Sequence, residues 1–468
     1  MKVYIETMGC QMNRLDSELV AGAIRAEGHE LVTDPTGADV LLYNTCSVRG
    51  HAEQKAHSRL AEQSRRKAES RRPIVIGVFG CMAQREGAPL LERYPQLDIV
   101  CGPGQLEAIP GLIAASANGQ RRRSAVLDPP RNDPDGCRES AFDRMDMSRD
   151  PSLTTGPAQA FVRISRGCNR FCTYCVVPYV RGPQLNRDPA RVVEEVRRLV
   201  EAGRSEITLL GQTVNAYRWR SGTTTVRFSD LLERVSAVAG LRRLRFVTSH
   251  PADFSDDVLE AMARLANVCP YIHLPAQSGS DAVLERMRRG YTRGQYDELV
   301  NRARAIVPGV VLAGDFIVGF PGETEEDHRA SADLIRRSGY KNSFIFRYSP
   351  RPATAAAEKL VDDVPLPVKQ RRHSELLAVQ AEVGLAHHHQ YVGETVEVLA
   401  EGPSPKAGKC KSSNGAGLSQ LVGRTTGDHI VVFDGGRELV TQYVQVEVLA
   451  ATPLTLIGKM APLSSASA

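Results

Sequence analysis

The chain has 468 residues, of which 42% are hydrophobic and 24% charged, as in an ordinary globular protein with two or three domains. The net charge of +5 is compatible with a polyanionic partner but does not require one. No apolar run reaches the roughly 18 residues of a membrane helix, and the N-terminus lacks the apolar core of a signal peptide, so we expect a cytoplasmic protein with reduced thiols and no membrane partner.

Residues 1–121 alternate between predicted strands and predicted helices. Short apolar runs are typical of strands, and each of them is followed by a helical stretch. The predicted strands are Val3–Ile5, Val40–Tyr43, Ile74–Phe79 and Ile99–Cys101. Repeated strand–helix units predict an α/β domain with a doubly wound parallel sheet.

Three cysteines occupy the same place in this alternation. Cys10, Cys46 and Cys81 each follow one of the first three predicted strands. In open α/β sheets, ligands bind outside the carboxyl ends of the strands, so we expect the three thiols to converge there. A single cysteine at such a place would be interpreted as a buried thiol. Three in register favour a metal site.

A segment rich in Pro, Asp and Arg at residues 122–157 predicts a linker. Residues 158–388 then resume the alternation, with helices such as Arg191–Ala202 and Glu325–Ser338 between strands. The predicted strands are Phe161–Ser165, Glu206–Leu210, Leu244–Thr248, Tyr271–Leu274, Leu312–Val318 and Phe344–Tyr348. About six parallel strands predict a partial (β/α)6 barrel, with its active site at the carboxyl ends of the strands.

Cys168, Cys172 and Cys175 follow the first strand of this barrel and lie close together in the sequence. Three thiolates are one short of the ligand set of a 4Fe–4S cube, which leaves one iron open to a substrate or cofactor. The alternatives are a structural zinc site or buried free thiols. Structural zinc takes four ligands, and the next Cys or His along the chain is His250. The spacing therefore favours the iron–sulfur cluster.

Residues 389–462 change to short alternating strands with Gly-rich turns, which predict a small β-barrel, and residues 463–468 form a tail. The strands are predicted at Val392–Leu399, Leu421–Arg424, His429–Phe433 and Tyr443–Leu449. Small barrels of this kind often bind nucleic acid, and this one has a basic side with Lys406, Lys409, Lys411 and Arg424. Solubility alone would also explain the three lysines.

Several motifs resemble the radical S-adenosylmethionine methylthiotransferases, and the resemblance covers nearly the whole chain. It is carried in order by Gly9-Cys-Gln-Met-Asn13, Asn44-Thr-Cys-Ser-Val-Arg49, Gly80-Cys-Met-Ala-Gln84, Cys168-Asn-Arg-Phe-Cys-Thr-Tyr-Cys175, Gln277-Ser-Gly-Ser280 and Tyr348-Ser-Pro-Arg-Pro352. The resemblance implies that residues 1–121 are the methylthiotransferase domain, residues 158–388 the radical domain, and residues 389–462 an RNA-binding TRAM domain.

The resemblance also implies the cofactors. Cys168, Cys172 and Cys175 would hold a radical 4Fe–4S cluster whose open iron chelates S-adenosylmethionine. Cys10, Cys46 and Cys81 would hold an auxiliary 4Fe–4S cluster that supplies or carries the inserted sulfur. Two S-adenosylmethionine molecules would be used per turnover, one for the radical and one for the methyl group. A reducing partner such as a flavodoxin or ferredoxin would supply the electron.

The implied substrate is tRNA, and the implied reaction adds a methylthio group at C2 of the N6-isopentenyladenosine next to the anticodon. Relatives of the same fold act instead on threonylcarbamoyladenosine in tRNA or on an aspartate of a ribosomal protein. A hypothesis of another class is a non-catalytic RNA-binding protein whose fold is stabilised by iron–sulfur clusters. A purely structural metal site usually has all its ligand positions filled by protein side chains, which three cysteines do not provide.

Five further residues at strand ends are candidates for binding S-adenosylmethionine. They are Gly211, Gln212, Gln277, Ser278 and Gly319. Each glycine could equally belong to an ordinary turn. His250 and His273 lie at strand ends too, but a hydrogen-bonded structural role is the favoured interpretation for each. We interpret Cys101, Cys137, Cys269 and Cys410 as buried thiols without a functional role. We interpret His387–His389 as part of an exposed junction between domains and not as a metal site.

Overall fold

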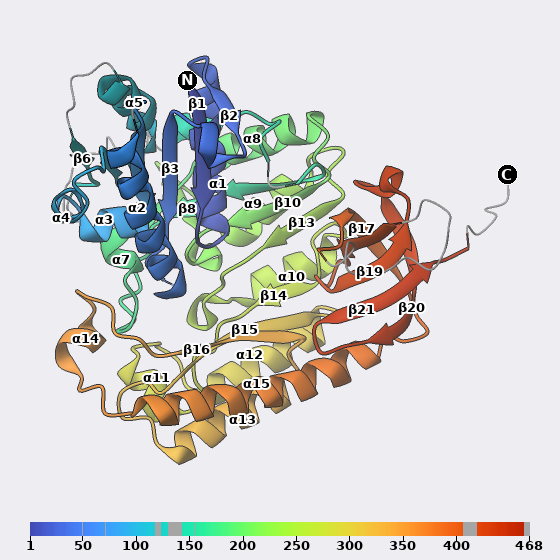
Figure 1. Ribbon diagram of the computed structural model, residues 1–468. Coiled ribbons are helices and arrows are strands. Elements are labelled where there is room, and N and C mark those ends of the chain that lie inside the picture. The colour runs from blue at the N-terminus through green and yellow to red at the C-terminus, as the bar shows by residue number, and fades with distance from the viewer. Residues whose placement is uncertain are drawn as a thin grey trace, which may run out of the picture.

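The computed structural model describes residues 1–48, 50–70, 72–117, 123–129, 143–154, 156–405 and 419–462. An N-terminal sheet, a central half-barrel and a C-terminal barrel follow one another in Figure 1 from blue to red. Part of the predicted linker, the three lysines at 406, 409 and 411, Cys137, Cys410 and the tail lie outside the described residues. Within the described ranges, no helix is both long and apolar enough to span a bilayer.

The N-terminal sheet has six parallel strands in the order β2-β1-β3-β4-β5-β6. Helices pack on both faces, with Leu15 and Ile113 in one core and Leu60 and Leu90 in the other, as predicted for a doubly wound sheet. Its elements are β1 (Lys2–Thr7), α1 (Gln11–Ala26), β2 (Glu30–Val32), β3 (Val40–Thr45), α2 (Gly50–Glu69), β4 (Val75–Gly80), α3 (Cys81–Glu86), α4 (Pro89–Arg93), β5 (Ile99–Cys101), α5 (Ile109–Ala117) and β6 (Ser124–Val126).

The position of β2 decides which strands become neighbours. The sequence pattern does not reveal this strand, because three residues carry too little alternation. It pairs with the outer side of β1, where Val3 lies opposite Leu31, and it does not separate β1 from β3. Strands β1, β3 and β4 are therefore adjacent, and the cysteines that follow them lie at one edge of the sheet.

The central half-barrel has six parallel strands in two groups, β7-β10-β13 and β14-β15-β16. A single parallel bridge from Leu244 to Val268 joins the groups. The strands are β7 (Gln159–Arg163), β10 (Glu206–Leu210), β13 (Arg243–Phe246), β14 (Tyr271–His273), β15 (Val311–Val318) and β16 (Asn342–Arg347). The helices between and after them are α8 (Pro189–Glu201), α9 (Phe228–Ser236), α10 (Asp256–Arg264), α11 (Asp281–Arg286), α12 (Arg293–Ile306), α13 (Glu325–Ser338), α14 (Ala355–Lys359) and α15 (Leu366–His389).

Alternation along these strands separates an outer core from an inner face. Val162, Leu209 and Phe316 pack against the outer helices, so their sequence neighbours point inward. On the β7–β10 side, α1 of the N-terminal domain covers that inner face, and Leu210 joins its core. The N-terminal domain is thus packed into one side of the half-barrel (Figure 1).

The C-terminal domain is a closed barrel in the order β17-β18-β19-β21-β20, as predicted for this region. Its strands are β17 (Thr395–Pro403), β18 (Ser419–Arg424), β19 (Ile430–Gly435), β20 (Tyr443–Ala451) and β21 (Thr455–Met460). The sequence pattern does not distinguish β21 from the end of the chain, yet this strand closes the barrel by pairing with β19 and β20.

The C-terminal barrel contacts the amino ends of the half-barrel strands. Arg243 at the start of β13 pairs with Glu397 at 2.8 Å, and Lys341 before β16 pairs with Asp428 at 2.6 Å. The cysteine loops lie at the opposite, carboxyl ends of the same strands. The two ends of the half-barrel therefore contact different partners within the chain (Figure 1).

Candidate functional site

The N-terminal cysteines follow three neighbouring strands, as the sequence predicts. Cys10 precedes the first residue of α1, Cys46 follows β3, and Cys81 is the first residue of α3. Cys46 and Cys81 are 1% and 3% exposed. A Cβ atom on Gly9 would come within 2.9 Å of the Cβ of Cys46, so glycine is needed where these two loops approach. The fold thus brings the loops of Cys10 and Cys46 into contact.

Two buried asparagines join the same two loops. The Asn13 amide donates to Asn44 Oδ1 at 2.7 Å and to the Thr45 carbonyl at 3.0 Å, while the Asn44 amide donates to the Asn13 carbonyl at 2.7 Å. The Cys10 thiol donates to Asn13 Oδ1 at 3.2 Å. A fully hydrogen-bonded polar pair of this kind fixes the relative position of the loops. Both asparagines belong to the motifs that carry the family resemblance, but the spacing of the motifs does not indicate that the two side chains pair.

The central cysteines lie in one loop between the short strand β8 (Ser165–Arg166) and α7 (Val177–Val180). Cys168 and Cys172 are buried, and Cys175 is half-buried. The Cys168 sulfur accepts a hydrogen bond from the Arg170 amide at 3.3 Å. Gly167 has φ +72°, and a Cβ atom there would collide with the carbonyl of Pro183. The loop that carries the triad therefore requires glycine at its first turn.

Burial raises the pKa of the thiols of Cys81, Cys168 and Cys175, the last to about 12. These groups are therefore protonated near neutral pH unless a metal stabilises the thiolate. Loading with iron would release their protons, as is general for thiolate ligands.

Both cysteine sets offer thiols, and thiolates are the usual ligands of iron–sulfur clusters. Among the described residues, no three Cys, His, Asp or Glu side chains converge closely enough to share one ion. A cube does not require such convergence, because each thiolate would bind a different iron. Three thiolates from one set would leave one iron of such a cube free of protein ligands.

The two cysteine sets are in contact through α3 and α7. Val176, directly after Cys175, packs against Cys81 together with Val180. Arg181, which directly follows α7, donates from Nε to Cys81 Sγ at 3.2 Å and from Nη2 to Asp16 Oδ2 at 2.8 Å. The loop of the central set thus forms one wall of the N-terminal set. The sequence pattern does not indicate this role of Arg181, because an arginine that contacts a cysteine has no characteristic spacing from it.

Two further arginines hold the central loop in place, Arg289 from outside it and Arg170 from within it. Arg289 is buried and donates to Cys172 Sγ at 3.4 Å and to the Pro275 carbonyl at 3.0 Å. Arg170 pairs with Asp253 through both carboxylate oxygens. Cationic donors next to thiolate sulfur stabilise its negative charge and fix the loop.

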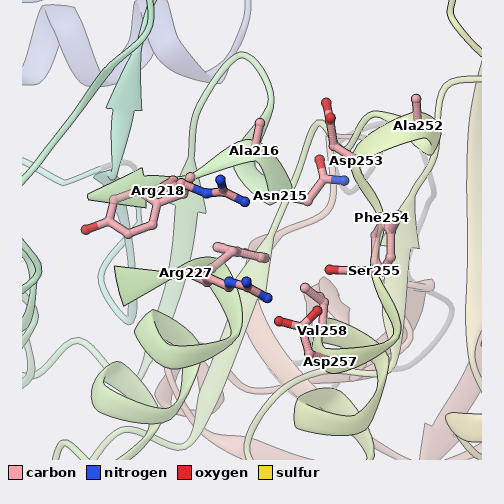
Figure 2. A pocket seen from close by; sticks show the side chains of 12 residues that line it. Asn215, Ala216, Arg218, Arg227, Ala252, Asp253, Phe254, Ser255, Asp257 and Val258 are labelled. Atoms are coloured by element: carbon pink, nitrogen blue, oxygen red, sulfur yellow. The ribbon is translucent and has the colours of Figure 1, made fainter. Parts of the chain in front are cut away.

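The Arg170–Asp253 pair adjoins a cavity of about 430 Å³ between the β11–β12 hairpin (Arg218–Ser221 and Thr224–Arg227) and the loop before α10. In Figure 2, Arg218 and Arg227 lie on one side of it, and Asp253 and Asp257 on the other. Asp253 lines this cavity and also pairs with Arg170 of the cysteine loop, so one side chain contacts both.

The five candidates for S-adenosylmethionine lie at strand ends, with different surroundings. Gly211 and Gln212 follow β10, and Gly319 follows β15 with φ +67°. Gln277 also has a positive φ, of 72°, and forms a parallel bridge to Phe316. Ser278 is buried against Ser331 of α13, with their hydroxyl oxygens 3.4 Å apart.

The two histidines at strand ends have different partners. His250 is buried, and its backbone exchanges hydrogen bonds with the Asn215 side chain at 2.8 and 2.9 Å. His273 contacts Asp315, with Nε2 3.2 Å from Oδ1. Cys101 and Cys269 are buried, and the Cys101 thiol donates to the Gln105 carbonyl at 3.2 Å. His387 contacts His429 across the junction of α15 and the C-terminal barrel.

Comparison with known proteins defines the class first. Residues 162–335 match the radical SAM superfamily, and residues 2–102 match the uncharacterized protein family UPF0004. A solved structure of the radical S-adenosylmethionine methyltransferase TsrM from Kitasatospora setae aligns with a TM-score of 0.54 over 76% of this chain and 77% of that one. At 18% identity this likeness concerns the fold alone.

Curated relatives then define the family. The chain is 47% identical to the tRNA-2-methylthio-N(6)-dimethylallyladenosine synthase of Rhodopirellula baltica, over 98% of this chain and 95% of that protein. It is 41% identical to the synthase of the same name from Syntrophotalea carbinolica, over 97% and 99% of the two chains. The chain belongs to the family of tRNA-2-methylthio-N(6)-dimethylallyladenosine synthases.

Proposed function

We propose that this protein is a tRNA methylthiotransferase, which inserts sulfur at C2 of N6-dimethylallyladenosine next to the anticodon and methylates that sulfur. The contact between the two cysteine sets carries the proposal. Because Val176 and Arg181 join the central loop to Cys81, a single bound base can face both sets. The names of the full-length relatives support the choice of nucleoside.

The proposed cofactors are two 4Fe–4S clusters and two S-adenosylmethionine molecules per turnover. Cys168, Cys172 and Cys175 would hold one cluster, and the second set, Cys10, Cys46 and Cys81, the other. When bound, these groups supply the radical that removes hydrogen from an unactivated aromatic carbon, together with the sulfur and methyl group that replace it.

The side chains of this protein orient the cofactors and exclude water. Arg181 and Arg289 donate to cysteine sulfurs from buried positions, so they stabilise thiolate charge where water is absent. We propose that Gly211, Gln212, Gln277 and Gly319 contact S-adenosylmethionine from the strand ends. Ser278, which contacts Ser331, would hold the loop that carries Gln277.

The proposed partners are tRNA and a reducing protein such as a flavodoxin or ferredoxin, in the cytoplasm. We propose that residues 1–121 belong to the auxiliary-cluster domain, whose sheet extends to β6 inside the predicted linker, residues 158–388 to the radical domain, and residues 389–462 to the RNA-binding domain. The mildly basic net charge of +5 is consistent with a tRNA partner.

The proposed substrate is tested by mass spectrometry of nucleosides from bulk tRNA of cells that lack this chain. We expect the methylthio-dimethylallyl nucleoside to disappear and to return when the wild-type chain is supplied. If that nucleoside persists and the methylthio form of threonylcarbamoyladenosine disappears, the substrate assignment is wrong.

The enzymatic nature is tested by electron paramagnetic resonance of the reduced, iron-loaded protein. Adding S-adenosylmethionine should change the cluster signal, because the cofactor chelates the open iron. An unchanged signal would favour a non-catalytic iron–sulfur RNA-binding protein.

A further inference from the structure

Two phenylalanines on β16 point to the inside of the half-barrel and are exposed. Ser343 and Ile345 are buried, and Ile345 belongs to the core between the strands and the outer helices. Phe344 and Phe346 alternate with them and are 48% and 37% exposed. Side chains that alternate with outward-facing residues point into a barrel, so the inner face of β16 is open and aromatic.

This inner face begins beside the central cysteines. Ile317 of β15 lies opposite Phe346 in the strand register. It packs in a cluster with Tyr174, whose position in the sequence is between Cys172 and Cys175. The phenylalanines therefore extend from the cysteine loop along the inside of β16.

A polar acceptor lies next to the aromatic rings. Asp315 of β15 is directly opposite Phe344 in the register. His273 contacts Asp315 Oδ1 at 3.2 Å, and Oδ2 accepts no hydrogen bond from any described residue. Both side chains are partly exposed, at 14% for His273 and 21% for Asp315. A carboxylate oxygen next to an exposed apolar surface is thus available to a ligand.

We infer that this surface, formed by Phe344, Phe346 and Asp315, binds the N6-substituent of the target adenine. The inference rests on the proposed function and names the residues that select the nucleoside. An N6-dimethylallyl adenine carries an apolar five-carbon chain and a single N–H donor on the same nitrogen. The chain lies on the two phenylalanine rings, and the N6–H donates to Asp315 Oδ2, while His273 positions the carboxylate.

The same surface disfavours the substrate of the related enzymes. A threonylcarbamoyl group carries a carboxylate and a hydroxyl on the N6 substituent. Next to Asp315 its negative charge is repelled, and next to Phe344 and Phe346 its polar atoms lose hydrogen bonds to water. The surface therefore selects an apolar substituent by attraction and rejects a charged one by repulsion.

The test uses equilibrium binding of the full-length, iron-loaded protein to anticodon stem–loop RNAs that differ only at N6 of the target adenine. Wild-type protein is expected to bind the dimethylallyl RNA about tenfold more tightly than the unmodified RNA, since the buried chain contributes to affinity. In the double variant Phe344→Ala/Phe346→Ala, this preference should fall to about twofold or less, with the affinity for unmodified RNA retained.

Matched variants separate the contributions. Leu377→Ala removes an apolar side chain that is 44% exposed on the outer helix α15, and it should keep the wild-type preference. Asp315→Asn keeps an acceptor oxygen and should keep most of the preference, whereas Asp315→Leu should lower the affinity for the dimethylallyl RNA about threefold or more and improve tolerance of threonylcarbamoyl RNA.

Two outcomes would overturn the inference: a double variant that keeps the full preference, or one that loses affinity for both RNAs equally. Nucleoside analysis of wild-type turnover on the same RNAs distinguishes the possible failures. If wild type forms the methylthio nucleoside and the variant keeps its preference, this inference alone is wrong. If wild type forms none, the proposed function is wrong and the inference fails with it.

Discussion

The two cysteine sets have the same number of thiols but are assembled in different ways. Cys168, Cys172 and Cys175 come from one loop, and their spacing is visible in the sequence. Cys10 and Cys46 come from different loops and meet only because β2 lies at the outer edge of the sheet. The central set therefore depends on local backbone geometry, whereas the N-terminal set depends on the topology and register of a whole domain.

The two sets also differ in the interactions that hold them in place. The central loop depends on Gly167 and on donors such as Arg289. The N-terminal set depends on a buried network that crosses the domain boundary, in which Asp16 accepts from Arg163 at 3.1 Å and from Arg181 at 2.8 Å. Perturbing the boundary should therefore damage the N-terminal set first.

The largest effect is expected from removing one ligand of the central set. Cys168→Ala should abolish turnover and lower the iron content by about half, while tRNA binding and the N-terminal cluster are kept. Iron analysis, nucleoside formation and RNA affinity measure these three properties. Cys269→Ala, which removes a buried thiol outside both sets, should leave all three unchanged. If Cys168→Ala also loses RNA binding, the central cluster is structural.

A smaller, directional effect is expected at Arg181. Replacing it by methionine removes the partner of Cys81 and leaves the buried Asp16 with one cation fewer, at a cost of about 3 kcal/mol in the free energy of unfolding. Denaturant unfolding measures the cost, and spectroscopy of each cluster should show loss from the N-terminal set first. Arg264→Met, which breaks an exposed pair with Glu233, is the control. Equal loss from both sets would contradict the comparison.

An acid-sensitive site is expected far from both sets, at the junction of α15 and the C-terminal barrel. Burial lowers the pKa of His387 from 6.5 to about 4, and His388, Lys341 and Arg304 add to the effect. His387 Nε2 lies 2.9 Å from Nε2 of His429, whose pKa burial lowers to about 2.

Because the folded-state pKa values lie below the unfolded ones, the unfolded chain takes up protons first as the pH falls. The stability from this junction is present above pH 6.5 and is lost as the pH falls towards about 4, by about 1–2 kcal/mol at pH 5. Thermal unfolding of His387→Gln between pH 7 and pH 5 should show a weaker pH dependence than wild type. The neighbouring exposed His389→Gln should not, and a wild-type profile for His387→Gln would refute the assignment.

The smallest effect is expected at Cys101. Its thiol is buried at the end of β5 and donates to the Gln105 carbonyl, so Cys101→Ala should cost about 1 kcal/mol of stability. Iron content and the spectrum of the N-terminal cluster should remain those of wild type. A changed spectrum would make Cys101 a fourth ligand and would remove the open iron from that set.

Local sequence patterns predict many of the strands and helices and one of the two cysteine sets. Strands β5 and β10 and helix α13 have the bounds that the apolar pattern indicates, and the central cysteines are found from spacing alone. Strands β2 and β21 are not predicted from the sequence. Strand β2 is too short to show an alternating pattern, and β21 is recognised only by its pairing with β19 and β20. The role of Arg181 is not predicted for a different reason: it depends on a contact with Cys81, which lies 100 positions earlier in the chain.

The packing of Val176 on Cys81 has a consequence for how the protein matures. A newly made N-terminal domain lacks the wall that α7 provides, and Asp16 lacks the guanidinium groups that balance its charge. A cluster held by Cys10, Cys46 and Cys81 would therefore meet its complete protein surroundings only after the central domain has folded onto the N-terminal domain. The domain that is synthesised first would then be the one whose site is completed last.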